Sequence, residues 1–324
     1  MPHPADGDVP LVSVLIVNYN GRPYLDACLE SVRRCVPQPH EVVVCDNGSR
    51  DDSVAYLRRA YPDVRVIVSP SNDGFASGNN QAAAAARGEL LFLLNNDTIL
   101  HEPLDAWIAH LRQDSRCGVL GPRLVFGYGL LQESVGIRET WWRLWTHWLP
   151  APGRFGWAQA LRLTRPRTHP VYDAREADVD WVSGAALLTP RALWERLGGM
   201  DAGFFMYLED TDYCRRVREA GYRVRYSADA TITHLEGGGK AWGGAAALER
   251  TLRSSRRFAA KHFGALSAAA LRVVLPVALS VRAVAYAALA LKGGATAGTR
   301  AEQARAYASA AGRVLSGQLW SVAR

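Results

Sequence analysis

Short apolar runs, each followed within a few residues by a cluster of Asn, Asp and Gly, recur four times in the first hundred residues. The runs are rich in β-branched residues and short enough to be buried strands, whereas the stretches between them place apolar residues at helical spacing. Strands that alternate with helices predict an α/β fold with a mostly parallel, twisted sheet flanked by helices. The predicted strands are 12–17, 41–45, 64–68 and 89–94, with helices from Tyr24 onward, over 52–60 and over 82–86.

The polar clusters that follow these strands are candidate ligand-binding residues, because ligands of such sheets bind beyond the carboxyl ends of the strands. Each cluster alone fits an ordinary turn, since Asn, Asp and Gly are the usual turn residues. Four in succession on one edge of a sheet favour a pocket. The clusters are NYNG (18–21), DNGS (46–49), NDGFASGNN (72–80) and NNDT (95–98).

The second half of the chain alternates less regularly. A strand is expected over 179–188, a helix from Pro190 to Gly198, a second helix over 212–220, and strand segments at 222–226 and 231–233. Five tryptophans interleaved with arginines crowd 141–167, a composition that fits a membrane-interface or lipid-acceptor surface, a substrate loop, or a helical pair with its tryptophans on the core.

The C-terminal region is basic and apolar. The net charge is +7, and residues 250–324 hold 12 Lys and Arg against one acid, which leaves −4 for the rest. This asymmetry fits an anionic membrane surface as partner, and equally a solubilising surface or compositional bias. The apolar stretch 265–291 carries Arg272 and Arg282, so an amphipathic helix on a membrane or on the catalytic domain is expected rather than a spanning helix.

The N-terminus and the cysteines indicate the compartment. The first ten residues are polar and Pro-rich, so we expect a disordered segment, no signal peptide and a cytoplasmic protein, peripheral at the inner face of the membrane if the tail binds lipid. Five cysteines without CxxC spacing indicate free thiols in a reducing compartment.

Three positions carry candidate chemistry. Asp97 ends an apolar strand, where a carboxylate can hold Mg²⁺ or Mn²⁺ against a diphosphate or can cap a turn. Glu209 and Asp210 follow the apolar run FFMYL, where one of them can act as a general base with a raised pKa or cap a helix. His234 alone is more often a structural residue.

Six segments in this order resemble glycosyltransferase family 2, whose members have the GT-A fold, and in particular its bacterial rhamnosyltransferase-like branch. They are VSVLIVNYNG, VVVCDNGSRDDS, NDGFASGNN, NND, WVSGAALLTPRAL and FFMYLEDTDYCRRVREAGYRV, and together with His234 they span residues 12–234. The resemblance implies a catalytic domain over 11–250, with a nucleotide-binding half over 11–125 and an acceptor-binding half over 126–250, followed by a helical region over 251–324.

The same resemblance implies roles for individual residues. Asp210, with Glu209, would be the catalytic base, and Asp97 and His234 would hold a divalent cation, Mg²⁺ or Mn²⁺. Asn95 departs from the family pattern, because it replaces the first acid of the metal motif. The implied donor-nucleotide residues are Val17, Tyr19, Asn20, Asp46, Asn47, Gly74, Phe75, Gly78, Asn79 and Asn96.

The implied reaction is an inverting transfer from a nucleotide diphosphate sugar to an acceptor hydroxyl. The branch suggests dTDP-rhamnose as donor, with UDP- or GDP-sugars as alternatives, and a glycan or lipid-linked acceptor in cell-surface glycan synthesis; no nucleic-acid partner is expected. Trp181, Ser183 and Gly184 are candidates for the acceptor side, since a glycine leaves room for a sugar and an aromatic ring can stack on it, although an ordinary buried strand fits as well.

Other classes fit the residues less well. A dinucleotide-dependent oxidoreductase needs a GxGxxG turn after the first strand, and the chain has NYNG there. A nucleotidyltransferase needs an early Gly-rich triphosphate loop with basic residues, which the sequence does not show. A non-catalytic sugar-nucleotide-binding protein is the remaining alternative, and retention of Glu209, Asp210 and His234 argues against it.

Overall fold

The computed structural model describes residues 11–136, 140, 170–235 and 244–321 and divides the chain into two compact units. The first unit contains the described residues 11–136, 170–205 and 209–235, and the second contains 140, 206–208 and 244–321. The predicted disordered N-terminus and the Trp-rich segment 141–167 lie outside the described residues.

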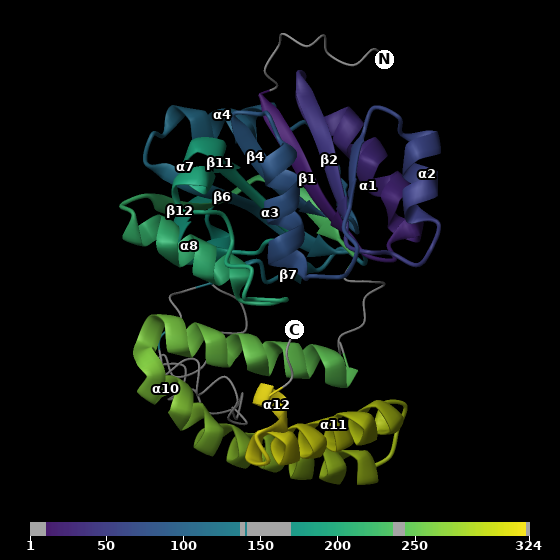
Figure 1. Ribbon diagram of the computed structural model, residues 1–324, viewed down its shortest axis with the longest axis vertical. Coiled ribbons are helices and arrows are strands. Elements are labelled where there is room, and N and C mark those ends of the chain that lie inside the picture. The colour runs from purple at the N-terminus through teal and green to yellow at the C-terminus, as the bar shows by residue number, and fades with distance from the viewer. Residues whose placement is uncertain (1–10, 137–139, 141–169, 236–243, 322–324) are drawn as a thin grey trace. The chain divides into compact units, whose positions relative to one another are not determined.

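The first unit is built on a mixed sheet in which β3, β2, β1 and β4 are parallel neighbours (Figure 1). β11 runs antiparallel between β4 and β6, and β12 runs parallel to β6. The strands are β1 (Val12–Asn18), β2 (His40–Asp46), β3 (Arg65–Val68), β4 (Leu90–Asn95), β5 (Thr98–Leu100), β6 (Cys117–Phe126), β7 (Leu131–Gln132), β8 (Val135–Gly136), β9 (Glu176–Val179), β10 (Trp181–Val182), β11 (Ala186–Pro190) and β12 (Arg223–His234). The predicted α/β fold is confirmed.

Helices cover both faces of this sheet because alternate residues of the central strands are buried on opposite sides. Val14, Ile16 and Phe92 pack in one core with α1 (Arg22–Cys35), α2 (Ser53–Ala60) and α4 (Asp105–Gln113). Leu15 and Leu93 pack in a second core with α3 (Phe75–Ala85), α7 (Arg191–Arg196) and α8 (Glu209–Glu219). In Figure 1, α3 lies in front of β1 and β2.

The structure corrects five of the predicted elements. Helix α3 begins at Phe75, inside the segment expected to be a turn, and α8 begins at Glu209 rather than after it. The single strand predicted over 179–188 is divided among β9, β10 and β11, because these segments pair with different strands: β9 with β12, β10 with β8 and β11 with β4. The two segments predicted within 222–233 form one strand, β12, with a register shift between Ser227 and Thr231.

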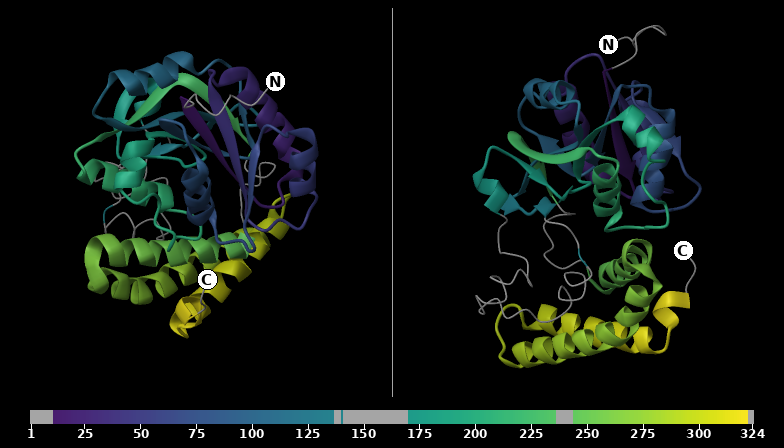
Figure 2. Two further views of the ribbon diagram at one scale, coloured as in Figure 1. Left: turned by 45° about the horizontal axis from the view of Figure 1, so that its top comes forward. Right: turned by 90° about the vertical axis from the view of Figure 1, so that its left-hand side faces the viewer.

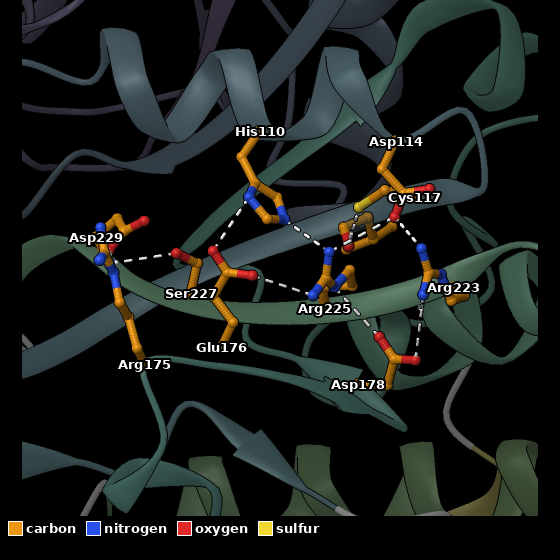
Figure 3. Close-up of polar contacts among 11 residues, drawn as sticks. His110, Asp114, Cys117, Arg175, Glu176, Asp178, Arg223, Arg225, Ser227 and Asp229 are labelled. Carbon is orange, nitrogen blue, oxygen red and sulfur yellow. Dashed lines mark hydrogen bonds and ion pairs between the residues drawn. The ribbon is translucent and has the colours of Figure 1, made fainter.

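A network of charges joins α4, β9 and β12 near the start of β12 (Figure 3). Arg225 lies 3.1 Å from Glu176, 3.2 Å from Asp178 and 2.7 Å from His110 Nε2, and its neighbour Arg223 pairs with Asp114. Cys117, buried beside these groups, has its thiol pKa raised to about 12 by burial. The network lies at the opposite end of β12 from His234, so it stabilises the sheet rather than the edge that the sequence singled out.

The second unit is helical, which confirms the predicted C-terminal helical extension. It contains α10 (Gly244–Leu291), α11 (Ala297–Leu315) and α12 (Gln318–Ser321), and α10 is interrupted at Gly264, whose φ is 85°. The part of α10 after Gly264 and α11 run side by side as a hairpin (Figure 2), with Leu271, Leu275 and Leu279 in their shared core. One window of α10 is long and apolar enough to cross a membrane, with mean hydropathy 1.9.

Candidate active site

The ends of β1 and β2 are joined by buried amide and carboxylate side chains. Asn18 Nδ2 donates to Asp46 Oδ2 at 2.8 Å, and Asn18 Oδ1 accepts from Asn96 Nδ2 at 2.8 Å. Asp46 Oδ1 accepts from the Ser49 backbone N–H, also at 2.8 Å. Asp46 is fully buried and both of its oxygens are engaged, so this carboxylate shapes the NYNG and DNGS turns from beneath.

The NYNG turn presents two of the predicted nucleotide residues at the surface. Tyr19 is 46% exposed, and Asn20 has a positive φ of 52°. Asn20 is held in this conformation by Ser49 Oγ, which accepts its backbone N–H at 2.8 Å, and by its own Oδ1, which accepts from the Arg50 N–H at 2.7 Å. The turn thus offers an aromatic ring beside a rigid backbone.

Through its glycines, the segment 72–80 closely approaches the backbone of Phe205 and the side chain of Val17 in β1. Gly74 has a φ of 90°, and a Cβ added there would lie 2.2 Å from the carbonyl oxygen of Phe205. Its own carbonyl accepts from Asn47 Nδ2 at 2.9 Å. A Cβ at Gly78 would lie 2.8 Å from Val17 Cγ1, so only glycine permits this approach. Asn79 is buried within α3 and donates to the Phe75 carbonyl at 3.0 Å, whereas the partly buried Phe75 ring lies beside Gly184.

Asp97 and His234 meet at the end of β4, although 137 positions separate them in the sequence. His234 Nε2 lies 3.3 Å from Asp97 Oδ1 and 3.1 Å from Asn95 Nδ2, and His234 Nδ1 lies 3.1 Å from Gln132 Oε1. β12 carries His234 there by pairing with β5, where His234 lies opposite Thr98. Both side chains are largely buried but retain some exposure to solvent.

This pair of side chains fits a divalent cation. Adjacent ligands of an octahedral ion with bonds of about 2.1 Å lie about 3 Å apart, which the 3.3 Å separation of Nε2 and Oδ1 approaches. No group of three or more His, Cys, Asp or Glu side chains suited to a metal occurs in the described part of the chain. An ion here would therefore need further oxygen ligands, and Mg²⁺ and Mn²⁺ commonly take these from water and a bound diphosphate.

Asp210, in the first turn of α8, reaches across to the turn before β11. Its Oδ2 accepts from the Gly184 backbone N–H at 2.9 Å, and its Oδ1 accepts from the Thr211 N–H at 2.7 Å. Burial disfavours the charged carboxylate and raises the pKa of Asp210, and these hydrogen bonds offset only part of that effect. A carboxylate with a raised pKa and a fixed orientation suits a general base.

The acids beside Asp210 have different surroundings. Glu209 is buried at the start of α8. Asp212 is completely buried and pairs with Arg216 at 2.9 Å, while Arg216 also donates to the carbonyls of Leu197 and Gly199. Asp212 thus ties α8 to the end of α7 and is a structural residue.

The three predicted acceptor residues surround the same turn. Gly184 lies between the Phe75 ring and Asp210, since a Cβ added to it would lie 3.0 Å from Phe75 Cε1 and 3.4 Å from Asp210 Cβ. The Ser183 backbone donates to the Ser134 carbonyl at 2.7 Å. The Trp181 ring packs over Gly136 on the neighbouring strand β8 and is partly exposed.

A chain of hydrogen bonds links Asp210 to the Asp97–His234 pair. Asp210 accepts the Gly184 N–H. The carbonyl of Ala185, the residue after Gly184, accepts the Asn95 N–H at 2.9 Å, and the Asn95 side chain contacts His234. The candidate base and the candidate cation site therefore lie along one edge of the sheet, at the end of β4.

Sequence reasoning gave no role to Gln132 or Thr211, and it named Asn18 and Ser49 only as members of the NYNG and DNGS clusters. Gln132 stands in a two-residue strand with no motif around it, and its contact with His234 depends on the fold alone.

Comparisons with known proteins identify a family and a fold to which the chain is similar. Residues 13–159 match the family described as Glycosyl transferase family 2. The chain is 28% identical over 239 residues to N-acetylglucosaminyl-diphospho-decaprenol L-rhamnosyltransferase of Mycobacterium tuberculosis. The matched region covers 69% of this chain and 76% of that protein.

Two solved structures share the fold. A mannosyltransferase from Pyrobaculum calidifontis, in complex with GDP-Man and Mn²⁺, has a TM-score of 0.54 at 20% identity and covers 97% of this chain and 87% of its own. GalNAc-T7 with UDP, GalNAc and Mn²⁺ has a TM-score of 0.55 at 18% identity and covers 78% of this chain and 48% of its own. The fold is that of the GT-A glycosyltransferases. In sequence the chain is similar to glycosyltransferase family 2 over residues 13–159 and to a mycobacterial rhamnosyltransferase.

Proposed function

We propose that the protein catalyses a metal-dependent, inverting transfer of a sugar from a nucleotide diphosphate to an acceptor hydroxyl, with Asp210 as the base. The observation that carries the proposal is the position of the Asp210 carboxylate, oriented by Gly184 and Thr211 and linked through Asn95 to the Asp97–His234 pair. One positioned carboxylate is sufficient for a single displacement, whereas glycoside hydrolysis uses two.

In this proposal Asp210 accepts the proton of the acceptor hydroxyl while the oxygen of that hydroxyl attacks the anomeric carbon from the face opposite the nucleotide. The bond between the anomeric carbon and the diphosphate oxygen breaks in the same step, and the nucleoside diphosphate leaves. The Gly184 and Thr211 N–H groups keep the carboxylate aimed at that hydroxyl. Asp97 and His234 would hold a divalent cation, which supplies positive charge to the diphosphate. The nucleotide would be bordered by Tyr19, Asn20, Asn47 and the backbone at Gly74. Asp46 would hold the turns of these residues in place through its hydrogen bonds to Asn18 and Ser49.

The test is nucleoside diphosphate release from a panel of sugar nucleotides, with Mn²⁺, Mg²⁺ or EDTA, by wild type and Asp97→Ala. The proposal expects release from one donor, lost with EDTA and in the variant. Donor binding is measured in parallel, so that a protein that binds without turnover is recognised as a non-catalytic binder. Formation of a nucleoside triphosphate and a sugar 1-phosphate after pyrophosphate is added would instead favour a nucleotidyltransferase.

We further propose dTDP-L-rhamnose as the donor and a lipid-linked, diphosphate-bearing glycan as the acceptor. The name of the mycobacterial relative specifies L-rhamnosyl transfer to a diphospho-decaprenol acceptor, which supports the sugar and the class of acceptor. The nucleotide, dTDP, is the one that the resemblance to the rhamnosyltransferase-like branch suggests. A competition assay with dTDP-, UDP- and GDP-sugars tests the donor. Preference for a UDP- or GDP-sugar would refute this part and leave the reaction class intact.

The second unit supports a further part of the proposal, which is that the protein associates peripherally with the cytoplasmic face of an anionic membrane. After Gly264, α10 exposes an apolar face made of Leu266, Val273, Val277, Val281, Val284 and Leu291. By contrast, α11 exposes polar groups such as Glu302, Arg305 and Ser309. A hairpin with one apolar and one polar side suits the membrane interface rather than a spanning position, and the charge of +11 after residue 249 suits anionic headgroups.

Vesicle sedimentation of the full chain tests this membrane association. The triple variant Val273→Gln, Val277→Gln and Val284→Gln should reduce binding to vesicles containing phosphatidylglycerol at least about tenfold, because it removes apolar surface from the bilayer contact. Ala308→Gln, on the exposed side of α11, is the control and should bind as wild type does. Binding by the triple variant equal to that of wild type would refute membrane association through this face. If the face instead joins two copies, the variant will change the molecular mass in solution.

A further inference from the structure

Gln132 reaches the candidate cation site from a strand that does not pair with the strand of His234. β7 pairs with β6, where Gln132 lies opposite Leu124, and β6 in turn pairs with β12. The turn between β6 and β7 is tight, because the Phe126 N–H donates to the Leu130 carbonyl at 2.8 Å. Gln132 is only 7% exposed, so its side chain is held among its neighbours.

The contact between Gln132 and His234 determines which imidazole nitrogen carries the proton. Gln132 Oε1 lies 3.1 Å from His234 Nδ1, and because an amide oxygen only accepts hydrogen bonds, Nδ1 must be the donor. In the neutral ring the lone pair is then on Nε2, the nitrogen that lies 3.3 Å from Asp97 Oδ1. The 3.1 Å contact of Nε2 with the Asn95 amide nitrogen requires the same tautomer, since that nitrogen only donates.

We propose that Gln132 is a positioning residue, which fixes His234 in the Nδ1–H tautomer and turns its Nε2 lone pair toward Asp97, ready to bind a divalent cation. A metal-binding histidine usually donates its other N–H to a hydrogen-bond acceptor, which fixes the ring and its tautomer. Here that acceptor is a neutral amide, so it orients the ring without adding charge to a site that has a single carboxylate. The inference rests on the cation site of the proposed function.

The experiment has one readout that needs no metal and one that does. Imidazole ¹⁵N shifts of the metal-free full-length protein, assigned with His234→Gln, report the tautomer of His234. Mn²⁺ binding, followed by electron paramagnetic resonance of the free ion, reports the affinity of the site. The variants are Gln132→Met, which keeps the size and removes the acceptor, and Gln132→Glu, which keeps an acceptor oxygen. Leu131→Met is a control for disturbance of β7.

The Nδ1–H tautomer is expected in wild type and in Gln132→Glu. Gln132→Met should lose this tautomer and bind Mn²⁺ about 10- to 100-fold more weakly, as is typical when a partner of a metal-binding histidine is removed. Leu131→Met should match wild type in both readouts.

An Nε2–H tautomer in wild type, or an unchanged tautomer and Mn²⁺ affinity in Gln132→Met, would overturn the inference while leaving the cation site standing. If wild type and Asp97→Ala both fail to bind Mn²⁺ while the tautomer still depends on Gln132, the cation site of the proposed function fails and the positioning of His234 stands.

Discussion

The backbone N–H of Gly184 donates a 2.9 Å hydrogen bond to the carboxylate of Asp210. This bond joins the turn before β11 to the first turn of α8 and fixes one oxygen of the carboxylate. A helix N-terminus stabilises a nearby negative charge, but burial of Asp210 outweighs this and raises its pKa. The arrangement keeps a carboxylate fixed in place yet basic enough to take a proton.

Replacing Asp210 with Asn should lower the transfer rate by a factor of about 10² to 10⁴, because a general base contributes about this much. Donor affinity, measured by calorimetry, should remain near that of wild type. The control is Asp212→Asn on the same helix, which should lower the free energy of unfolding through the loss of its buried pair with Arg216 but leave turnover of the folded protein largely intact. Near-normal turnover in Asp210→Asn would contradict the assignment.

The pH dependence of kcat/KM should show an acidic limb set by Asp210. A base acts only when deprotonated, so activity should fall as the pH drops through its pKa, which burial raises above the ordinary 3.8. The midpoint of the limb should therefore lie above 3.8. The residual activity of Asp210→Asn should lack this limb, and a limb that persists unchanged in the variant would assign it to another group.

Gly74→Ala should weaken donor binding at least about tenfold, because its Cβ would lie 2.2 Å from the Phe205 carbonyl oxygen and would displace the segment 72–80. Gly198→Ala is the matched control, since Gly198 also has a positive φ, of 72°, but nothing lies within 4 Å of an added Cβ. Both variants should lose some stability to backbone strain. Only Gly74→Ala should change the donor Kd in a titration, and similar Kd values for the two variants would refute the role of this segment.

Asn95→Asp should tighten Mn²⁺ binding by roughly tenfold, since it adds a carboxylate where an amide now lies 3.1 Å from His234 Nε2, and metal affinity rises with the charge of the ligands. The control is Asn96→Asp, which adds the same charge one residue away, against Asn18. Its effect on Mn²⁺ affinity should be smaller. Equal affinities in all three proteins would argue against a cation site at the end of β4.

Arg225→Met should lower the free energy of unfolding by about 1–2 kcal/mol, because Glu176 and Asp178 lose a shared cation in the network of Figure 3. Arg175→Met should have almost no effect, since Arg175 is 80% exposed and pairs only with Asp229 among the described residues. Urea unfolding measures both. A change of donor affinity in Arg225→Met would show that the network reaches the active site, contrary to its position at the start of β12.

The two central cores were predictable because strand and helix periodicities are local. Val14, Ile16 and Leu15 alternate between the two faces of β1 as their spacing requires. Helix α3 was misplaced because Asn79 and Gly78 are poor helix formers, and their packing on β1 and β2 overrides that preference. The sequence did not predict the break at Ser183 and Gly184, because apolar residues lie on both sides of it. The hydrogen bond from the Gly184 N–H to Asp210 forms at this break, and it depends on the position of α8, which is distant in the sequence.

The sequence by itself determined the order of strands and helices, the four polar clusters at the strand ends and the acids at 97, 209 and 210 as candidate site residues. Each of these features is recognised from a pattern of residues only a few positions apart. Only the tertiary structure decided which of these side chains meet. His234 reaches Asp97 because β12 pairs with β5, and Gln132 reaches His234 through two successive strand pairings. Asp212 becomes a structural residue and Asp210 a candidate base because burial and partners, rather than spacing, distinguish two acids on the same helix.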